Sequence, residues 1–190
     1  MPLLGSDDPL PCCPRRILVS GTSGSGKTTL SARIAALLDI EHVEIDALFH
    51  GPDWTPREQF LADVRAFSSR PLWVTEWQYD SVRDLLADEA DLLVWLDLSR
   101  FTVMRQVVAR TVRRRFRREV LWNGNVEAPL RTFFFNRDHI IRWAWNTHRN
   151  SGLQVVELRR RRPDLAIVRL QTRSEVERWI AGPLRCAERP

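Results

Sequence analysis

The sequence is almost without lysine. Its 29 basic residues include a single lysine, Lys27, and all the others are arginine. Because arginine supplies the positive charge everywhere else, position 27 is expected to need the compact ammonium group and flexible stem of lysine. The net charge of +5 suits phosphate-bearing partners, but it is too small to indicate a nucleic-acid-binding protein by itself.

Cysteine and long apolar runs are scarce as well. Cys12, Cys13 and Cys186 show no C-x-x-C spacing, which argues against a zinc site and a disulfide framework and fits a reducing cytoplasm. No stretch of 18 apolar residues occurs, and the first 14 residues lack the basic and apolar regions of a secretion signal. We therefore expect a cytoplasmic protein with no membrane partner.

The order of apolar segments predicts one α/β domain. Four prolines in residues 1–14 indicate a loose, flexible tail, so the domain is expected to span 15–190. Short apolar runs alternate with stretches of helical periodicity, which predicts a three-layer fold with a five-stranded parallel sheet and helices on both faces. The expected strands are 15–20, 43–45, 72–75, 92–96 and 167–170, and the expected helices are 27–38, 57–67, 81–90, 99–118 and 137–162.

Two further boundaries follow from turn-forming residues. Thr55 and Pro56 suit the N-cap and first position of the helix at 57–67, and Ser151-Gly152 is a point where the last long helix could break. Residues 119–136 follow neither the helical nor the strand period. Together with the arginines before them they predict a lid segment at 110–136.

The segment from Gly21 to Thr28 matches the phosphate-loop motif G-x-x-x-x-G-K-[ST] and lies between a predicted strand and a predicted helix. Glycines let successive backbone N–H groups face a phosphate, and the following helix adds the positive end of its dipole. We expect ATP or another nucleoside triphosphate here, with Lys27 at the β and γ phosphates and Thr28 on Mg²⁺. The expected nucleotide-binding residues are Gly21, Thr22, Ser23, Gly24, Ser25, Gly26, Lys27, Thr28 and Thr29.

The motif, the order of elements and several short strings resemble the adenylate-kinase-like P-loop kinases. Within them the chain is most similar to the small bacterial P-loop proteins called topology modulation proteins or AAA family ATPases. The strings that carry this resemblance are Ile45–Leu48, Tyr79 with Arg83, Trp95–Asp97, Arg110–Arg114, Leu121–Asn125 and Val168–Leu170.

The resemblance implies a kinase that moves the γ-phosphoryl group of Mg-ATP to a small-molecule or nucleotide acceptor, which the sequence does not identify. Asp46 would orient the acceptor, although helix or turn capping explains it equally well. Tyr79 and Arg83 would also meet the acceptor. Asp97, at the end of a predicted strand, suits capping of the next helix as well as metal contact.

A carboxylate at Glu76 stands where the related proteins usually open an Asp-Gly-Asn-Tyr string. Here the string is Glu76-Trp77-Gln78-Tyr79. Glu76 would hold Mg²⁺ through water or accept the acceptor's proton. Trp77 in place of glycine alters the expected shape of the acceptor pocket.

Seven arginines lie between Arg105 and Arg118, and several share one helix face. For a kinase, Arg110 and Arg114 would clamp the transferring phosphoryl group, while other arginines of this helix would only face solvent. The alternative is a nucleic-acid-associated P-loop NTPase, in which the same helix contacts phosphates and Trp122 and Phe133–Phe135 stack on bases.

Overall fold

The computed structural model describes residues 3–117 and 150–187. Its centre is a parallel sheet of six strands in the order β1-β6-β5-β2-β4-β3. The three-layer α/β prediction is confirmed, but with one strand more than the five expected. The strands are β1 (Leu3–Leu4), β2 (Arg16–Gly21), β3 (Glu41–Val43), β4 (Trp73–Glu76), β5 (Leu92–Leu96) and β6 (Ala166–Leu170).

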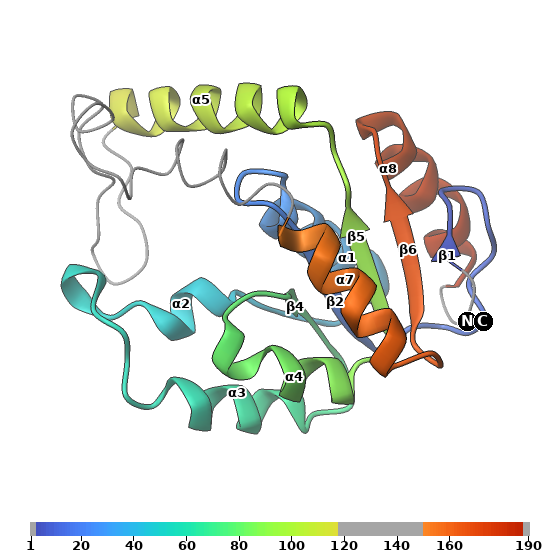
Figure 1. The fold of residues 1–190 in the computed structure, drawn as a ribbon, viewed down its shortest axis with the longest axis horizontal. Coiled ribbons are helices and arrows are strands. Elements are labelled where there is room, and N and C mark those ends of the chain that lie inside the picture. Colours follow the sequence, from blue (N-terminus) through green and yellow to red (C-terminus); the bar gives the residue numbers. More distant parts are fainter. Residues whose placement is uncertain (1–2, 118–149, 188–190) are drawn as a thin grey trace.

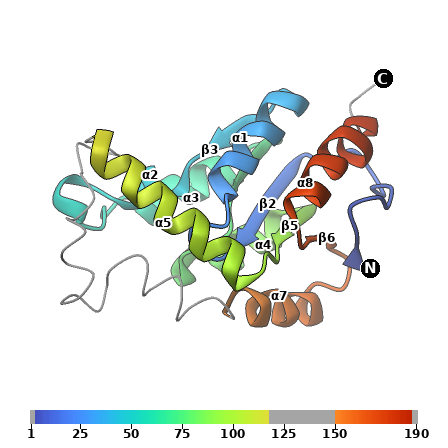
Figure 2. The same ribbon diagram turned by 90° about the horizontal axis from the view of Figure 1, so that it is seen from above.

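Helices cover both faces of this sheet (Figures 1 and 2). Residues of α1, α5 and α8 share one buried apolar cluster with the strands, and residues of α3, α4 and α7 share the other. Strand residues contribute to the two clusters alternately, with Ile17 and Val19 in the first and Leu18 in the second. The helices are α1 (Lys27–Leu38), α2 (Ile45–Phe49), α3 (Phe60–Ser68), α4 (Asp80–Glu89), α5 (Arg100–Arg117), α7 (Asn150–Arg161) and α8 (Arg173–Trp179), with a 3-10 turn at Pro52–Trp54 and a π turn at Ile180–Leu184.

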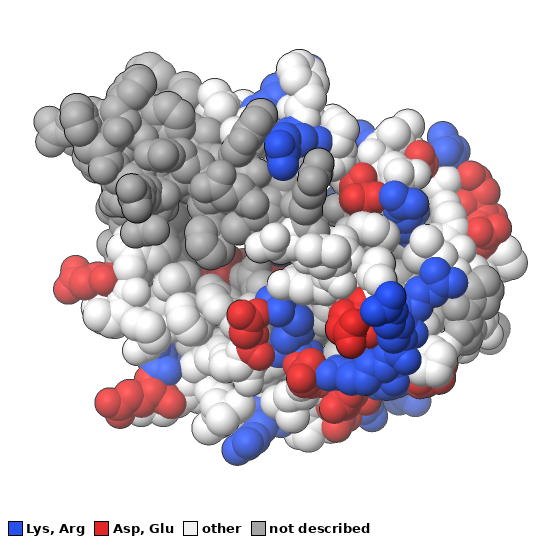
Figure 3. All heavy atoms as spheres, viewed as in Figure 1, with Lys and Arg blue, Asp and Glu red and all other residues white. Residues whose placement is uncertain are grey.

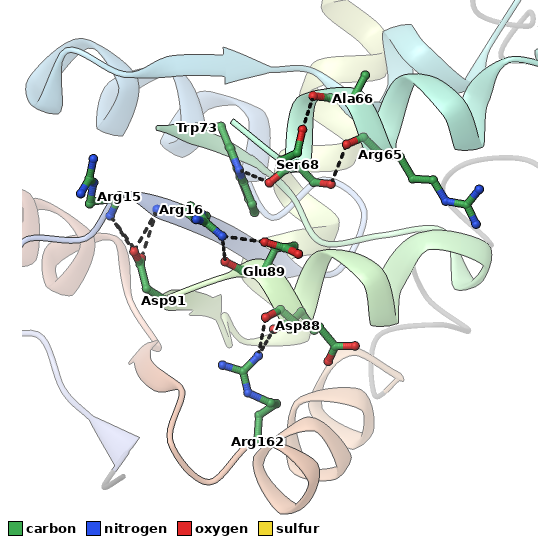
Figure 4. A network of polar contacts seen from close by, with 12 residues as sticks. Arg15, Arg16, Arg65, Ala66, Ser68, Trp73, Asp88, Glu89, Asp91 and Arg162 are labelled. Carbon is green, nitrogen blue, oxygen red and sulfur yellow. Dashed lines mark hydrogen bonds and ion pairs between the residues drawn. The ribbon is translucent and has the colours of Figure 1, made fainter. Parts of the chain in front are cut away.

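The amino ends of the central strands are fixed by backbone contacts (Figure 4). The Asp91 carboxylate accepts hydrogen bonds from the backbone N–H groups of Arg15 and Arg16 at 3.0–3.2 Å. Arg162 donates to the carbonyls of Ala87 and Asp88 at 2.7 and 2.9 Å. The Asp91 contacts anchor β2, the strand that leads into the phosphate loop, and the Arg162 contacts hold the end of α4 to the end of α7.

Two expected boundaries near the third strand and helix are wrong. The strand expected at 43–45 is β3 at Glu41–Val43, and α2 already begins at Ile45, whose N–H donates to the buried Glu76 carboxylate at 3.3 Å. Thr55-Pro56 does not start α3. Pro56 forms a bridge with His50, so the helix begins only at Phe60.

The segment expected to be a loose tail forms part of the fold. Leu3 and Leu4 pair with β6, and Arg178 of α8 contacts Ser6 and Asp7. Only two apolar residues form this strand, too few to show a strand period in the sequence.

The late helix and the lid are described in part. α7 begins at Asn150 and runs through Ser151-Gly152 without a break, and the earlier part of the helix expected at 137–162 lies outside the described residues. Of the lid expected at 110–136, residues 110–117 belong to α5 and the rest is outside the described part of the chain. None of the helices in residues 3–117 and 150–187 could span a membrane.

Candidate functional site

The phosphate loop has the expected strand-loop-helix setting. It leaves β2 at Gly21 and enters α1 at Lys27. Gly24 and Gly26 have φ angles of 81° and 100°, in the left-handed region that favours glycine. The Ser25 N–H donates to the Thr22 carbonyl at 3.0 Å and closes the turn. The loop therefore places the amino end of α1 beside the carboxyl end of β2, where an anion gains from the helix dipole.

The Lys27 ammonium group folds back over this loop. Its Nζ donates to the carbonyls of Gly21 and Thr22 at 3.0 and 3.5 Å. Burial lowers the pKa of Lys27, and the charge of Arg110 lowers this pKa further. The negative charges of Asp46 and Glu76 act in the opposite direction and raise it. Three other predicted site residues, from α2, β4 and α5, therefore lie within electrostatic reach of Lys27.

Hydroxyl groups in and after the loop suit a nucleotide with its metal. Ser25 Oγ is buried and has no hydrogen-bond partner among the described residues, while Thr28 and Thr29 are exposed in the first turn of α1. No group of three or more His, Cys, Asp or Glu residues that could hold a metal occurs within the described ranges. A nucleotide-bound Mg²⁺ needs only one or two protein oxygens besides phosphate and water, so Thr28 fits that role.

Glu76 is buried at the end of β4, and both of its carboxylate oxygens have partners. One oxygen lies 3.0 Å from His42 Nε2, and the other accepts from the Ile45 N–H at 3.3 Å. Burial acts to raise the pKa of Glu76, but the hydrogen bond and charge of His42 and the backbone donors outweigh it and lower this pKa. The carboxylate is thus ionised and holds the first turn of α2, the turn that carries Asp46.

Asp46 is the centre of a second polar cluster. Its Oδ1 accepts hydrogen bonds from Gln78 Nε2 and from the Tyr79 hydroxyl, the latter at 2.5 Å. The Tyr79 hydroxyl also lies 3.2 Å from His50 Nε2. Burial and the neighbouring Asp46 charge raise the pKa of Tyr79 far above its usual range, so the phenol stays protonated and donates.

Backbone strain and aromatic packing fix Tyr79 in this position. Its φ angle is 64°, a conformation that costs energy for a residue other than glycine. The ring stacks on Phe49 with centroids 4.1 Å apart and meets Phe60 edge-on at 5.4 Å. The rings of Trp54 and His50 lie beside them, with centroids 5.0 Å apart. We call the rings of Phe49, His50, Trp54, Phe60 and Tyr79 the aromatic wall.

Two further predicted residues, Arg83 and Asp97, have partners within the fold. Arg83 forms an ion pair with Asp80 and lies over the Trp77 ring at 5.5 Å. With the Gln154 amide oriented so that its oxygen faces Arg83, this oxygen accepts from Arg83 at 3.0 and 3.2 Å and joins α4 to α7. Asp97 forms an ion pair with Arg169, while Ser99 caps α5 by accepting from the Thr102 N–H at 3.2 Å.

Arg110 and Arg114 both belong to α5. Arg110 is partly buried and lies close enough to affect the Lys27 pKa. The Arg114 side chain is outside the described part of the structure, so its expected contact with phosphate stays a prediction.

Several site residues could not be found from the sequence. His42 lies on the edge strand β3, His50 ends α2, and Gln106 lies on α5 with no motif around it. Gln78 lies inside the Glu76–Tyr79 string, and this string is the one local feature of the sequence that indicates that Gln78 belongs to the site.

Comparison with protein-family models and with curated proteins finds no match. Among solved structures, a gluconokinase from Sinorhizobium meliloti 1021 has a TM-score of 0.53 at 22% identity, covering 93% of this chain and 95% of that one. A shikimate kinase from Bacteroides thetaiotaomicron has a TM-score of 0.48 at 13% identity, with coverages of 88% and 95%. A sugar kinase from Janibacter sp. HTCC2649 has a TM-score of 0.48 at 18% identity, and the alignment covers 100% of each chain. The first of these similarities shows that the chain shares the α/β fold of that gluconokinase.

Proposed function

We propose that this protein is an ATP-dependent phosphotransferase acting on a small molecule. The observation that carries the proposal is the position of Lys27 over the phosphate loop at the carboxyl end of β2, with Asp46, Glu76 and Arg110 close enough to affect its charge. Ligands of open parallel sheets bind at this end. The kinase fold of the solved gluconokinase agrees with the proposal.

The phosphate loop would bind the nucleotide triphosphate tail. Backbone N–H groups from Gly21 to Lys27 and the start of α1 would face the phosphates, and Lys27 would leave its two carbonyl partners for phosphate oxygens. Ser25, Thr28 and Thr29 would add hydroxyl contacts. A Mg²⁺ ion held by Thr28, with Glu76 reaching it through water, would neutralise charge on the phosphates.

Asp46 would receive the acceptor. Both of its side-chain donors reach Oδ1, which leaves Oδ2 to accept a hydrogen bond from an acceptor hydroxyl or amine. In the transfer, a bond forms between the acceptor atom and the γ-phosphorus, the bond from that phosphorus to the β-γ bridging oxygen breaks, and the acceptor's proton passes to Asp46. Tyr79 and the aromatic wall would orient the acceptor.

Positive charge from α5 would complete the site. Arg110, and Arg114 four residues further along the same helix, would face the transferring phosphoryl group and stabilise its charge. We also propose that residues 110–136 form a lid, which closes over the nucleotide and the acceptor.

The test is ADP release by purified protein with ATP, Mg²⁺ and a panel of acceptors that includes sugars, nucleosides and nucleoside monophosphates. One class of acceptor should accelerate ADP release, Lys27→Ala should abolish it, and Arg110→Ala should slow turnover more than it weakens nucleotide affinity. The surface substitution Arg33→Ala, which removes an exposed ion pair with Glu177, is the matched control. A protein that fails to bind ATP or GTP with Mg²⁺ would refute the proposal.

The same assay separates the kinase from a nucleic-acid-associated NTPase, which would show steeply salt-dependent binding to DNA or RNA and no acceptor. The basic residues at the end of α7 and directly after it are paired with carboxylates. Arg161 pairs with Asp84 at 2.5 Å and Asp88 at 3.3 Å, and Arg162 pairs with Asp164. On the described part of the face that Figure 3 draws, positive and negative side chains are interleaved. The exposed free thiols of Cys12, Cys13 and Cys186 suit the reducing cytoplasm in which we propose that the reaction takes place.

A further inference from the structure

Helix α5 crosses over the phosphate loop (Figure 2), and several of its described side chains are exposed. Its side chains Val103 and Val107 are buried, whereas Phe101 is 78% and Val108 is 43% exposed. Val107 packs directly on the loop, since a Cβ atom added to Gly24 would lie 2.1 Å from Val107 Cγ2. Small apolar side chains give attraction without direction, so they do not by themselves fix the register of α5 on the loop.

Gln106 supplies a directional contact at the same place. With its amide nitrogen toward the phosphate loop, it donates to the Gly24 carbonyl at 2.8 Å. The amide oxygen then accepts from Arg173 Nε and Nη2, both at 3.2 Å. Arg173 is the first residue of α8, directly after the turn that follows β6. One side chain therefore joins three parts of the fold: the phosphate loop, α5 and the start of α8.

We propose that Gln106 is a positioning residue, which holds α5 in register over the phosphate loop and so places Arg110 at the phosphoryl group. The inference rests on the proposed kinase function. Arg110 lies one turn beyond Gln106 on α5, and its charge already reaches Lys27. A shift of α5 along the loop would carry Arg110 away from a bound phosphate, and electrostatic stabilisation falls when a charged group is misplaced.

Three variants separate the contacts of Gln106. Gln106→Leu removes both, Gln106→Glu keeps the Arg173 contact but has no donor for the Gly24 carbonyl, and Arg173→Ala removes only the outer contact. Turnover should fall about tenfold in Gln106→Leu and Gln106→Glu, the size of one lost hydrogen bond to a partly buried group, and less in Arg173→Ala. The KM for ATP should rise less than turnover falls, because the larger effect of Gln106 is on the placement of Arg110 and the smaller one is on the loop that binds the nucleotide. Gln106→Leu combined with Arg173→Ala should be no slower than Gln106→Leu alone.

A second measurement does not depend on catalysis. Amide hydrogen exchange of the loop residues 22–26 in protein without nucleotide should become at least tenfold faster in Gln106→Leu, because the Gly24 carbonyl loses its partner. Arg178→Ala is the control, since it lies on the same helix as Arg173 but contacts Ser6 and Asp7. Unchanged exchange and unchanged turnover in Gln106→Leu would overturn the inference. Wild-type protein without any phosphoryl transfer would instead refute the kinase proposal, and the exchange result would still decide whether Gln106 holds the loop.

Discussion

At the scale of single residues, Gly24 and Gly26 share a left-handed backbone but differ in their surroundings. A Cβ atom at Gly24 would clash with Val107, whereas a Cβ atom at Gly26 would meet nothing within 4 Å. We expect Gly26→Ala to cost about 1–2 kcal/mol from backbone strain, and Gly24→Ala to cost about 1–3 kcal/mol more from overpacking. Urea unfolding of both variants measures the difference.

The same pair can be tested through Val107. In a Val107→Ala background the extra cost of Gly24→Ala should disappear, while the cost of Gly26→Ala should stay. Equal costs for the two glycine substitutions in the wild-type background would mean that α5 does not press on the loop.

Asp46 and Tyr79 should affect chemistry to different degrees. Asp46→Asn removes the proposed base and should lower kcat by about 10²–10⁴-fold while ATP affinity stays within a few-fold. Tyr79→Phe keeps the stack on Phe49 but removes the hydroxyl that donates to Asp46, so about a tenfold loss is expected. Steady-state kinetics with the identified acceptor measure both. Asp63→Asn, which alters only the surface pair with Arg57, should match wild type, and an unimpaired Asp46→Asn enzyme would remove Asp46 from the mechanism.

At the scale of elements, the buried contact between β4 and α2 makes stability depend on pH. The pKa of Glu76 is lowered in the folded protein from its ordinary value of 4.5. A lowered carboxyl pKa contributes stability that is fully present above the unfolded value and is lost as the pH falls through the folded value. Glu76→Gln should therefore lower the free energy of unfolding by about 1–3 kcal/mol at pH 7. This deficit should shrink below about pH 4.5. Urea unfolding of both proteins at pH 7 and below about pH 4.5 tests the direction of this pH dependence. A stability deficit of Glu76→Gln that grows in acid would contradict it.

The elements also differ in how far the sequence predicts them. Strands β2, β4, β5 and β6 are buried and apolar, so their runs are visible in the sequence. Strand β3 contains Glu41 and His42, and its end is set by the distant Glu76, which no local pattern records. The phosphate loop was predictable because its chemistry lies in one continuous segment. The contacts of Glu76 with His42 and of Gln106 with Arg173 join separate elements, so only the fold brings them together.

At the scale of the whole molecule, the amino-terminal segment closes one edge of the sheet. Leu3 and Leu4 extend the sheet beyond β6, and β1 is separated from β2 by β6 and β5. Leu3 packs against one apolar cluster and Leu4 against the other. An open strand edge and the loss of two half-buried leucines both disfavour the folded state.

Replacing both residues, Leu3→Asp with Leu4→Asp, should therefore lower the free energy of unfolding by about 2 kcal/mol in urea titrations. Affinity for Mg-ATP should stay within twofold of wild type, because the phosphate loop follows β2 in the interior of the sheet. Cys12→Ser, at an exposed position of the same segment, should change neither quantity. An unchanged urea midpoint in the double variant would show that β1 adds nothing to stability. A large loss of ATP affinity would show that this sheet edge is coupled to the phosphate loop, three strands away.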